Sequence, residues 1–523
     1  MRKFTIIFFT ILIVLGALVD LTMMDSRLWI YWVYGGFLIL LTIAIVDSVQ
    51  KKNAIRRNYP LFGNLRFLLR SMAPEIHQYF VEGNTDGKPF SKNQIDLVEG
   101  RAELKLRSHP FGTEENVYRD GAEWAPHSQF PLSPEHVESR ILIGGSDCKQ
   151  PYSSCILNIS GMSYGALSKN AVLALNGGAN LGNFSHNTGE GGLSKFHLQP
   201  GGDLVWQIGT GYFGCRTIEG NFSPEIFKEK AAHQNVKMIE IKLSQGAKPG
   251  HGGLLPAVKN TKEIAEIRGI VAHTTVHSPP HHTAFDGIKG LLEFVVKLRD
   301  LSEGKPIGFK LCIGKKSEFE EMCAEMVRSG NIPDFITVDA AEGGTGAAPL
   351  EFSNNFGMPG QEAVSFVDDV LRGYDLRDKI KVLYSGKVLS AFDIVRAIAA
   401  GADACVSARA MMFALGCIQA LHCNNNSCPT GIATQKSNLV KGLDVAHKTQ
   451  RVYNYHKETV ETAREMIGAL GLTSFSDANR SHIYQWSGES NRSIQLNDIY
   501  PEVENGSYLN RMKLQKVDRI IEK

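Results

Sequence analysis

Short apolar runs alternate with longer helical segments from about residue 150 onward, and this alternation constrains the fold more than any other feature. It is typical of βα units, in which helices join the strands of a parallel sheet and cover it. The expected strands are 155–160, 238–243, 307–312, 335–339, 382–385 and 404–407. The expected helices are 169–181, 288–301, 317–329, 391–400 and 409–421. A series of about 280 residues predicts an α/β fold, the (β/α)8 TIM barrel, with a doubly wound open sheet as the alternative.

Glycine-rich segments follow several of these strands. They read SGMSYG at 160–165, NTGEGG at 187–192, AEGGTGAAP at 341–349 and SGK at 385–387. In a barrel the carboxyl ends of the strands form the active site, and glycines there let backbone amides approach a phosphate or a flat ring. The sequence therefore predicts a cofactor site at this end of the barrel, with the phosphate at the last two strand ends.

Two uncharged apolar runs precede this region, at 4–19 and 28–46. The second has 19 residues, the length that spans about 30 Å of hydrocarbon, so residues 1–50 are predicted to form a transmembrane hairpin. Basic residues flank the hairpin on both sides, and the positive-inside rule then places the rest of the chain in the cytoplasm. A cleaved signal peptide on an exported protein is the alternative. The flanking charges are Arg2, Lys3, Lys51, Lys52, Arg56 and Arg57, and the connection carries Asp20, Asp25 and Arg27.

The overall charge argues against nucleic acid as a partner. The chain of 523 residues has 56 basic and 54 acidic residues, and no strip of basic and aromatic residues stands out. Such a balance produces no field strong enough to hold a polyanion. We therefore expect the partner to be a small molecule or another protein.

Three of the nine cysteines fall within twelve positions, in the segment GCIQALHCNNNSCPTGIATQ at 416–435. A reducing cytoplasm disfavours disulfides and leaves these thiols for ligation, catalysis or simple burial. The C-x5-C-x4-C spacing of Cys417, Cys423 and Cys428 is able to hold the irons of a three-iron cluster, and a cysteine followed by proline also ends ferredoxin-type motifs. Zinc is an alternative that needs a fourth ligand, either His422 or a distant residue. Burial as small apolar side chains is another.

Several long motifs occur in one order: SGMSYGALS, SHNTGEGG, KLSQGAKPGHGGLLP, SPPHH, EGGTGAAP and then the cysteine segment. Together they resemble the FMN-binding domain of the glutamate synthase family. The resemblance covers about residues 60–487 and is specific, because several long motifs recur in register. It implies a (β/α)8 barrel that holds FMN, and a [3Fe-4S] cluster with Cys417, Cys423 and Cys428 as ligands.

The resemblance implies a reaction as well as a fold. In the family, FMN receives electrons singly from the iron–sulfur cluster and passes them on as hydride, which converts 2-oxoglutarate and ammonia into L-glutamate. Gln245, Lys248 and Arg268 match family residues that hold 2-oxoglutarate, and an arginine offers a bidentate contact to a carboxylate. Judged without the resemblance, Lys248 and Arg268 are more often solvated surface charges.

Two more residues join Lys248 in the predicted catalytic set through the resemblance. Glu190, in NTGEGG, would orient the substrate or a proton, while the plainer interpretation is a loop carboxylate or a helix cap. Lys310, in the expected strand 307–312, would lie near the N1 and O2 edge of the flavin and stabilise its reduced anion. Its plainer interpretation is a strand-end lysine that reaches solvent.

The phosphate site departs from the family pattern at two strand ends. Ser385-Gly386-Lys387 stands where the family has Asp-Gly-Gly, and Ala408-Arg409 stands where it has Gly-Thr. We expect Lys387 and Arg409 to replace backbone contacts with charge. The predicted cofactor-binding residues are Ser160, Gly161, Met162, Ser163, Lys310, Gly343, Gly344, Thr345, Ser385, Gly386, Lys387, Ala408 and Arg409.

The expected organisation differs from that of family members that use glutamine. Those begin the mature chain with a nucleophilic cysteine and carry a C-terminal β-helix domain, and neither is expected here. Residues 1–50 should form the hairpin, 51–149 an extension that packs on the barrel, 150–440 the barrel, and 441–523 a helical segment and a polar tail.

The predicted function is that of a membrane-anchored, cytoplasm-facing FMN and iron–sulfur oxidoreductase. It would make glutamate from 2-oxoglutarate and ammonia, with electrons from a donor protein that the sequence does not name. One alternative is a related flavoenzyme that acts on another 2-oxo acid or amine, and another is a membrane module that only relays electrons. A pure relay would not need a dicarboxylate clamp, so Gln245, Lys248 and Arg268 favour the synthase.

Overall fold

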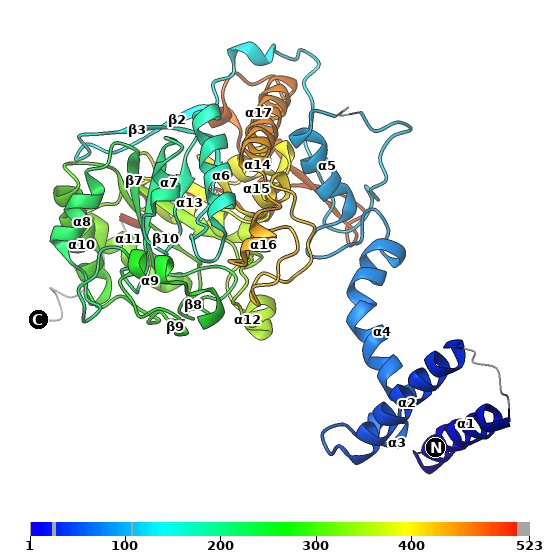
Figure 1. The fold of residues 1–523 in the computed structure, drawn as a ribbon. Helices are drawn as coiled ribbons and strands as arrows, with labels where there is room; N and C mark the ends of the chain where they lie inside the picture. The colour runs from blue at the N-terminus through cyan, green and yellow to red at the C-terminus, as the bar shows by residue number, and fades with distance from the viewer. Residues whose placement is uncertain (1, 23–27, 106–107, 510–523) are drawn as a thin grey trace, which may run out of the picture. The chain divides into compact units, whose positions relative to one another are not determined.

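Eight parallel strands among the described residues close into a barrel, in the order β4-β5-β6-β7-β10-β11-β12-β13. Two of them, β7 and β10, are labelled in Figure 1. The structure is a computed structural model that describes residues 2–22, 28–105 and 108–509. Pairing of β13 with β4, for example Cys405 opposite Leu157, closes the ring. The predicted TIM barrel is therefore confirmed, and the open doubly wound sheet is wrong. The strands are β4 (Leu157–Ile159), β5 (His186–Asn187), β6 (Leu204–Ile208), β7 (Val236–Lys242), β10 (Ile307–Leu311), β11 (Phe335–Asp339), β12 (Lys381–Ser385) and β13 (Ala404–Ser407).

Six of these strands lie where the apolar pattern predicts them, and β5 and β6 are the two that it misses. β5 has only two residues, His186 and Asn187, and both are polar, so no apolar run marks it. β6 reads LVWQI and is buried along its whole length. Such a run is typical of a parallel strand that is covered on both faces, so the sequence did carry a signal for β6.

Helices surround the barrel, and four of them agree with the predicted helices within one residue at each end: α6 (Lys169–Gly182), α10 (Gly287–Leu301), α11 (Lys316–Ser329) and α14 (Ala391–Ala399). The fifth, α15, begins at Arg409 as predicted but ends at Ala414 instead of residue 421. It ends there because Gly416 adopts φ 98°, a left-handed conformation that terminates helices. Further helices are α7 (Lys195–Leu198), α8 (Pro224–Ala231), α9 (Lys262–Arg268), α12 (Leu350–Asn355), α13 (Gly360–Gly373) and α16 (Ser437–Val440).

A β-hairpin closes the amino-terminal end of the barrel. In it, β2 (Arg140–Ile143) pairs antiparallel with β3 (Tyr152–Cys155). Apolar side chains of the hairpin and of five barrel strands form one buried cluster: Ile143, Tyr152, Val205, Met238, Phe335, Leu383 and Ala404. Because this end is packed with side chains, the functional pocket lies at the opposite end, where the carboxyl ends of the strands meet.

The helix α17 (Val445–Ala469) packs on the outside of the barrel against α6 and α14. Its His456 ring stacks on the Phe184 ring with centroids 3.7 Å apart, and Nε2 of His456 lies 2.9 Å from the backbone oxygen of Leu157 in β4. This helix therefore ties a late part of the chain to the first barrel strand. The helix α5 (Lys92–Ala102) packs on α17. Other elements after residue 90 are β8 (Leu254–Leu255), β9 (Val276–His277), α18 (Leu496–Ile499) and a small sheet of β1 (Glu123–Trp124), β14 (Tyr484–Ser487) and β15 (Arg492–Gln495).

The chain divides into two compact units, Met1–Pro89 and Phe90–Lys523, and the barrel belongs to the second. The described residues of the first unit form four α-helices, and the last of them continues as a π-helical turn at His77–Val81. They are α1 (Arg2–Thr22), α2 (Leu28–Val49), α3 (Ala54–Asn58) and α4 (Phe62–Ile76).

Among the described residues, Trp32–Val49 of α2 is the one helical segment long and apolar enough to cross a membrane. α1 offers a shorter apolar stretch, Phe4–Ala17. The two helices pack on each other, with the ring centroids of Phe9 and Phe37 6.1 Å apart. The connection at 23–27 lies outside the described residues. The transmembrane hairpin therefore stays a prediction, with α2 as its better candidate span.

Candidate active site

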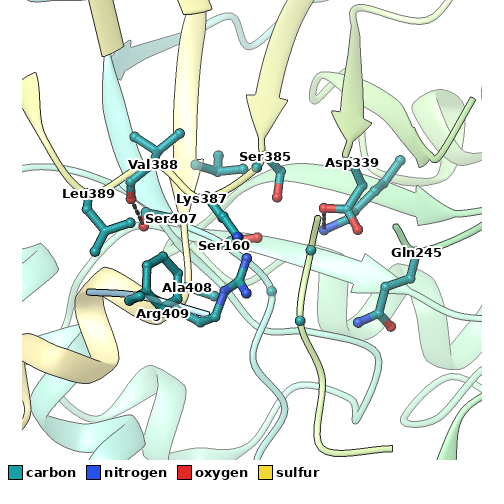
Figure 2. Close-up of a pocket in the computed structure, with 17 residues that line it drawn as sticks. Ser160, Gln245, Asp339, Ser385, Lys387, Val388, Leu389, Ser407, Ala408 and Arg409 are labelled. Atoms are coloured by element: carbon teal, nitrogen blue, oxygen red, sulfur yellow. Dashed lines mark hydrogen bonds and ion pairs between the residues drawn. The ribbon is translucent and has the colours of Figure 1, made fainter. Parts of the chain in front are cut away.

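A pocket lies at the carboxyl ends of the barrel strands (Figure 2). Ten of the predicted cofactor-binding residues line it: Ser160, Gly161, Lys310, Gly343, Gly344, Ser385, Gly386, Lys387, Ala408 and Arg409. The other three, Met162, Ser163 and Thr345, belong to the same loops but do not line the pocket. The pocket wall also contains Phe90, Gln245, Asp339, Val388, Leu389, Val406 and Ser407.

Two cations, Lys387 after β12 and Arg409 after β13, lie on one side of the pocket, whereas Asp339 and Gln245 lie on the other (Figure 2). Both cations approach the ring of Phe90: Arg409 Cζ is 4.7 Å and Lys387 Nζ is 5.7 Å from its centroid. Arg409 Nη2 also donates a hydrogen bond of 2.7 Å to a backbone oxygen, that of residue 342. The last two strand ends thus place positive charge in the pocket.

Phe90 reaches the pocket from a segment that precedes the barrel in the sequence. The side chain of Gln419 holds it in place, since Gln419 accepts a hydrogen bond from the Phe90 amide at 3.2 Å and donates one to the Phe90 carbonyl oxygen at 3.1 Å. The Phe90 ring also packs edge-on against Phe413, with centroids 5.4 Å apart. Because Gln419 belongs to the cysteine segment, that segment holds one residue of the pocket wall in place.

Lys310 forms a buried ion pair on the opposite side of the pocket. Its Nζ lies 2.9 Å from Oδ1 of Asp339, and both side chains are less than a tenth exposed. Burial acts to lower the pKa of Lys310, but Asp339 and Glu240 outweigh it and raise that pKa, so the side chain is charged. The backbone amide of Gly246 donates to Oδ2 of Asp339 at 2.7 Å. Lys310 is therefore a fixed buried cation, and its interpretation as a lysine that reaches solvent is wrong.

A second group of charges lies beside the pocket, around Glu190. Lys242 Nζ is 3.2 Å from Oε2 of Glu190 and donates a 3.0 Å hydrogen bond to Oε1 of Gln245, which lines the pocket. Burial acts to raise the pKa of Glu190, but Lys242, Lys248 and Arg268 together lower it. The Glu190 side chain is consequently a carboxylate at neutral pH.

Lys248 and Arg268 are only 2% and 5% exposed, so their interpretation as solvated surface charges is wrong. Lys248 Nζ donates to the backbone oxygen of Gly252 at 2.6 Å, and Arg268 Nη2 donates to that of Tyr164 at 3.1 Å. Burial lowers the pKa of Arg268 to about 10 and also lowers that of Lys248. The buried Nε of Arg268 has no hydrogen-bond partner among the described residues. With Lys242, three cations surround a single carboxylate.

Sequence reasoning missed Lys242 and Asp339, although a signal for both was present. Each is the last residue of a barrel strand, β7 or β11. In a TIM barrel a polar residue at that position faces the active site. Phe90 carried no comparable signal, because its contact with Gln419 joins residues 329 positions apart.

The three cysteines lie between α15 and α16, and all are free thiols. Cys428 is buried, and Cys417 and Cys423 are half-buried. Burial raises the pKa of Cys417 to about 12. Burial acts in the same direction on Cys428, but hydrogen bonds from Thr430 and from backbone amides lower its pKa. In the part of the chain that the structure describes, no three His, Cys, Asp or Glu side chains are grouped so as to hold one metal ion.

A buried lysine lies against the cysteine segment. Lys259 is 2% exposed, and its Nζ donates hydrogen bonds to the backbone oxygens of Cys423 at 2.7 Å and Ala166 at 3.0 Å. Burial lowers the pKa of Lys259 to about 8, while Cys423 and Cys428 act to raise it. A buried ammonium is costly unless an anion lies close by. The cysteine thiols are the groups in a position to supply that anion.

Comparison with known proteins identifies the family. Residues 122–473 match the conserved region in glutamate synthase. The chain belongs to the glutamate synthase family. It is 36% identical over 484 residues to the glutamate synthase large subunit-like protein YerD of Bacillus subtilis (strain 168), a match that covers 84% of this chain and 91% of that protein.

Two other family members are named as synthases. Over 349 residues the chain is 36% identical to the archaeal glutamate synthase (NADPH) of Methanocaldococcus jannaschii. This match covers 66% of this chain and 63% of that enzyme. Over 315 residues it is 34% identical to the archaeal-type glutamate synthase (NADPH) of Thermotoga neapolitana, with 60% of this chain and 59% of that enzyme covered. The chain thus spans most of the Bacillus protein but less than two thirds of these two synthases. As a member of the glutamate synthase family it is an oxidoreductase.

Proposed function

We propose that this member of the glutamate synthase family converts 2-oxoglutarate and ammonia into L-glutamate, with FMN and a [3Fe-4S] cluster as cofactors. The observation that carries the proposal is the group of three cations, Lys242, Lys248 and Arg268, around the one carboxylate of Glu190. Buried charges are costly unless they are compensated. A dicarboxylate such as 2-oxoglutarate would supply the two negative charges that the group lacks.

The chain's own residues account for binding and orientation in this reaction. Arg268 offers a bidentate contact to one carboxylate of 2-oxoglutarate, and Lys248 pairs with the other. Ammonia replaces the 2-oxo oxygen, which leaves as water, and a hydride and a proton then reduce the C=N bond to the amine. The charged Glu190 is suited to hold the ammonium ion and to take up the proton that it releases. Bound FMN supplies the hydride, and the cluster supplies electrons to it one at a time.

The pocket fits FMN in its distribution of charge and space. Lys387 and Arg409 offer positive charge for a phosphate at the last two strand ends. A Cβ at Gly386 would lie 2.5 Å from Oη of Tyr384, and one at Gly344 would lie 2.9 Å from Nη1 of Arg409, so glycine lets these pocket loops pack directly against the two side chains. Lys310 on the other side is suited to the edge of the flavin ring that becomes negative on reduction.

Lys259 supports a cysteine-bound cluster over simple burial of the thiols. A cluster that is held by three thiolates carries negative charge, and the buried ammonium beside Cys423 would compensate part of it. Each cysteine of a three-iron cluster binds a different iron, so the sulfur atoms lie further apart than around a single ion. We assign Cys417, Cys423 and Cys428 as the ligands.

The proposal includes a location. The apolar length of α2 and the basic residues on both sides of the α1–α2 pair support anchoring in the cell membrane, with α1 as a second span and the barrel in the cytoplasm. A reporter enzyme fused after Lys523 should then be active only on the cytoplasmic side. Activity on the outer side would overturn this part of the proposal and leave the chemistry untouched.

Stopped-flow spectroscopy tests the reaction. Protein purified without oxygen should show a flavin spectrum and contain about three irons and one FMN per chain. After reduction with dithionite, the flavin should be reoxidised rapidly by 2-oxoglutarate with ammonium and poorly by pyruvate with ammonium, because pyruvate lacks the second carboxylate. If 2-oxoglutarate with ammonium fails while an artificial acceptor takes the electrons readily, the protein is an electron relay and the glutamate assignment is wrong.

A further inference from the structure

Helix α4 carries an apolar face that the described residues of its own unit leave exposed. Phe62, Leu65, Leu69, Met72 and Ile76 recur at alternating intervals of three and four residues, so they share one side of the helix. All five are exposed, from 39% at Ile76 to 65% at Phe62. We call these five residues the α4 face. Solvent is an unfavourable environment for a continuous stripe of this kind, so another surface should cover it.

The charge around the α4 face is strongly one-sided. Arg66 and Arg70 border the face, one and two turns into the helix. The stretch at 51–76, which ends with α4, contains one acidic residue, Glu75, and six basic residues: Lys51, Lys52, Arg56, Arg57, Arg66 and Arg70. An apolar stripe bordered by basic side chains is the pattern of a helix that lies in the interface of a membrane with anionic lipids.

The start of α4 is fixed next to the end of α2. Asp47, near the end of α2, accepts hydrogen bonds at Oδ2 from the backbone amide of Leu61 at 3.1 Å and from Nδ2 of Asn64. At Gly63 a Cβ would lie 2.9 Å from Cα of Arg56, so α3 and α4 pack too closely there for a larger residue. These contacts hold the first turn of α4 beside the last turn of the candidate membrane span.

We infer that α4 lies on the cytoplasmic surface of the membrane, with the α4 face among the lipid headgroups and Arg66 and Arg70 paired with anionic lipid. The inference rests on the membrane anchoring by α2 proposed above. A second copy of the chain is the competing occupant, since the three–four spacing also suits a coiled coil. Leu68 and Ala73 widen the apolar surface beyond the two positions of a coiled-coil seam, and this width favours lipid.

Photo-crosslinking in the full-length protein distinguishes the possible occupants. The photoreactive amino acid p-benzoylphenylalanine replaces Leu69 on the α4 face, or Ser71 on the opposite side of the helix, or Ile39 in α2. Each protein is reconstituted in nanodiscs of phosphatidylcholine with or without phosphatidylglycerol and irradiated. Intact-mass and peptide analysis then identify what each position has captured. Position 39 reports on the membrane span, position 69 on the α4 face, and position 71 is the matched control.

Lipid adducts at positions 39 and 69, but not at 71, would support the inference. The adduct at 69 should be several times more abundant with phosphatidylglycerol, and the variant with Arg66→Gln and Arg70→Gln should lose this dependence. A crosslink from position 69 to a second copy, or to the barrel of the same chain, would overturn the inference. If position 39 still captured lipid in that case, the membrane anchoring would stand. Absence of lipid at 39 would overturn the anchoring and the inference together.

Discussion

At the scale of single residues, Arg268 is the best-placed test of substrate binding. Its guanidinium is buried beside Glu190, and its buried Nε finds no hydrogen-bond partner within the described part of the chain. A charge-assisted hydrogen bond contributes about 1.5 to 3 kcal/mol, and 1.4 kcal/mol is about a factor of ten. Arg268→Ala should therefore raise the KM for 2-oxoglutarate about tenfold to a hundredfold in steady-state assays.

Arg268→Lys and the flavin content serve as controls for this variant. Lysine keeps the charge but loses the bidentate geometry, so its KM should lie between those of the wild type and Arg268→Ala. Arg268 does not line the cofactor pocket, and the FMN content should stay at the wild-type level. Loss of FMN from both variants would show that Arg268 supports the fold and not the substrate.

Lys259 should set the redox potential of the proposed cluster. Its ammonium is buried against the cysteine segment, and a nearby positive charge makes the addition of an electron easier. Lys259→Gln retains hydrogen-bond donors for the two backbone oxygens but removes the charge. The midpoint potential, followed by electron paramagnetic resonance, should become more negative in Lys259→Gln and stay close to wild type in Lys259→Arg. Equal potentials in all three proteins, with equal iron content, would contradict this role.

At the scale of elements, His456 makes the packing of α17 sensitive to acid. Burial lowers the pKa of His456 to about 4, against about 6.5 in an unfolded chain. Protonation of His456 therefore favours the unfolded state. Its contribution to the free energy of unfolding is fully present above pH 6.5 and is lost as the pH falls towards 4. Through His456 alone, the free energy of unfolding should be about 2 kcal/mol lower at pH 5 than at pH 7.

Urea unfolding of the wild type and of His456→Gln at the two pH values measures the effect. The variant should be less stable at pH 7, because the stacking on Phe184 is lost. Its further loss of stability on going to pH 5 should be smaller than that of the wild type by about 2 kcal/mol. An identical pH dependence in both proteins would assign the acid sensitivity to other buried groups.

A helix or strand can be predicted from the sequence where a single local pattern of apolar residues determines it. Four outer helices and six strands carry uninterrupted periodicity or apolar runs, and they were located closely. The helix at Arg409 was predicted too long, because the helix-ending φ at Gly416 has no signature in apolar periodicity. At the site, the motifs predict Gln245, Lys248 and Arg268 as substrate residues, whereas the ion pairs of Lys242 and Lys310 depend on which strands become neighbours.

At the scale of the whole molecule, the second unit holds every proposed cofactor and substrate residue. A chain that begins at Phe90 should therefore fold without detergent, bind FMN and reoxidise with 2-oxoglutarate and ammonium at the wild-type rate. Absorbance spectra and stopped-flow kinetics of the truncated protein measure both properties. Truncation three residues later would remove Phe90 from the pocket wall and should weaken FMN binding, because Phe90 lies against both Lys387 and Arg409.

The seam between β13 and β4 has a consequence for biosynthesis. There β13 pairs with β4, with Cys405 opposite Leu157. The ribosome must therefore add about 250 residues after β4 before the barrel is able to close. At roughly 5 to 20 residues per second, this takes on the order of 10 to 50 seconds. By then α2 has long left the exit tunnel and been available to the insertion machinery. Until β13 is synthesised, the edge of β4 that will pair with it stays unpaired. We expect the nascent chain to need chaperones most in that interval.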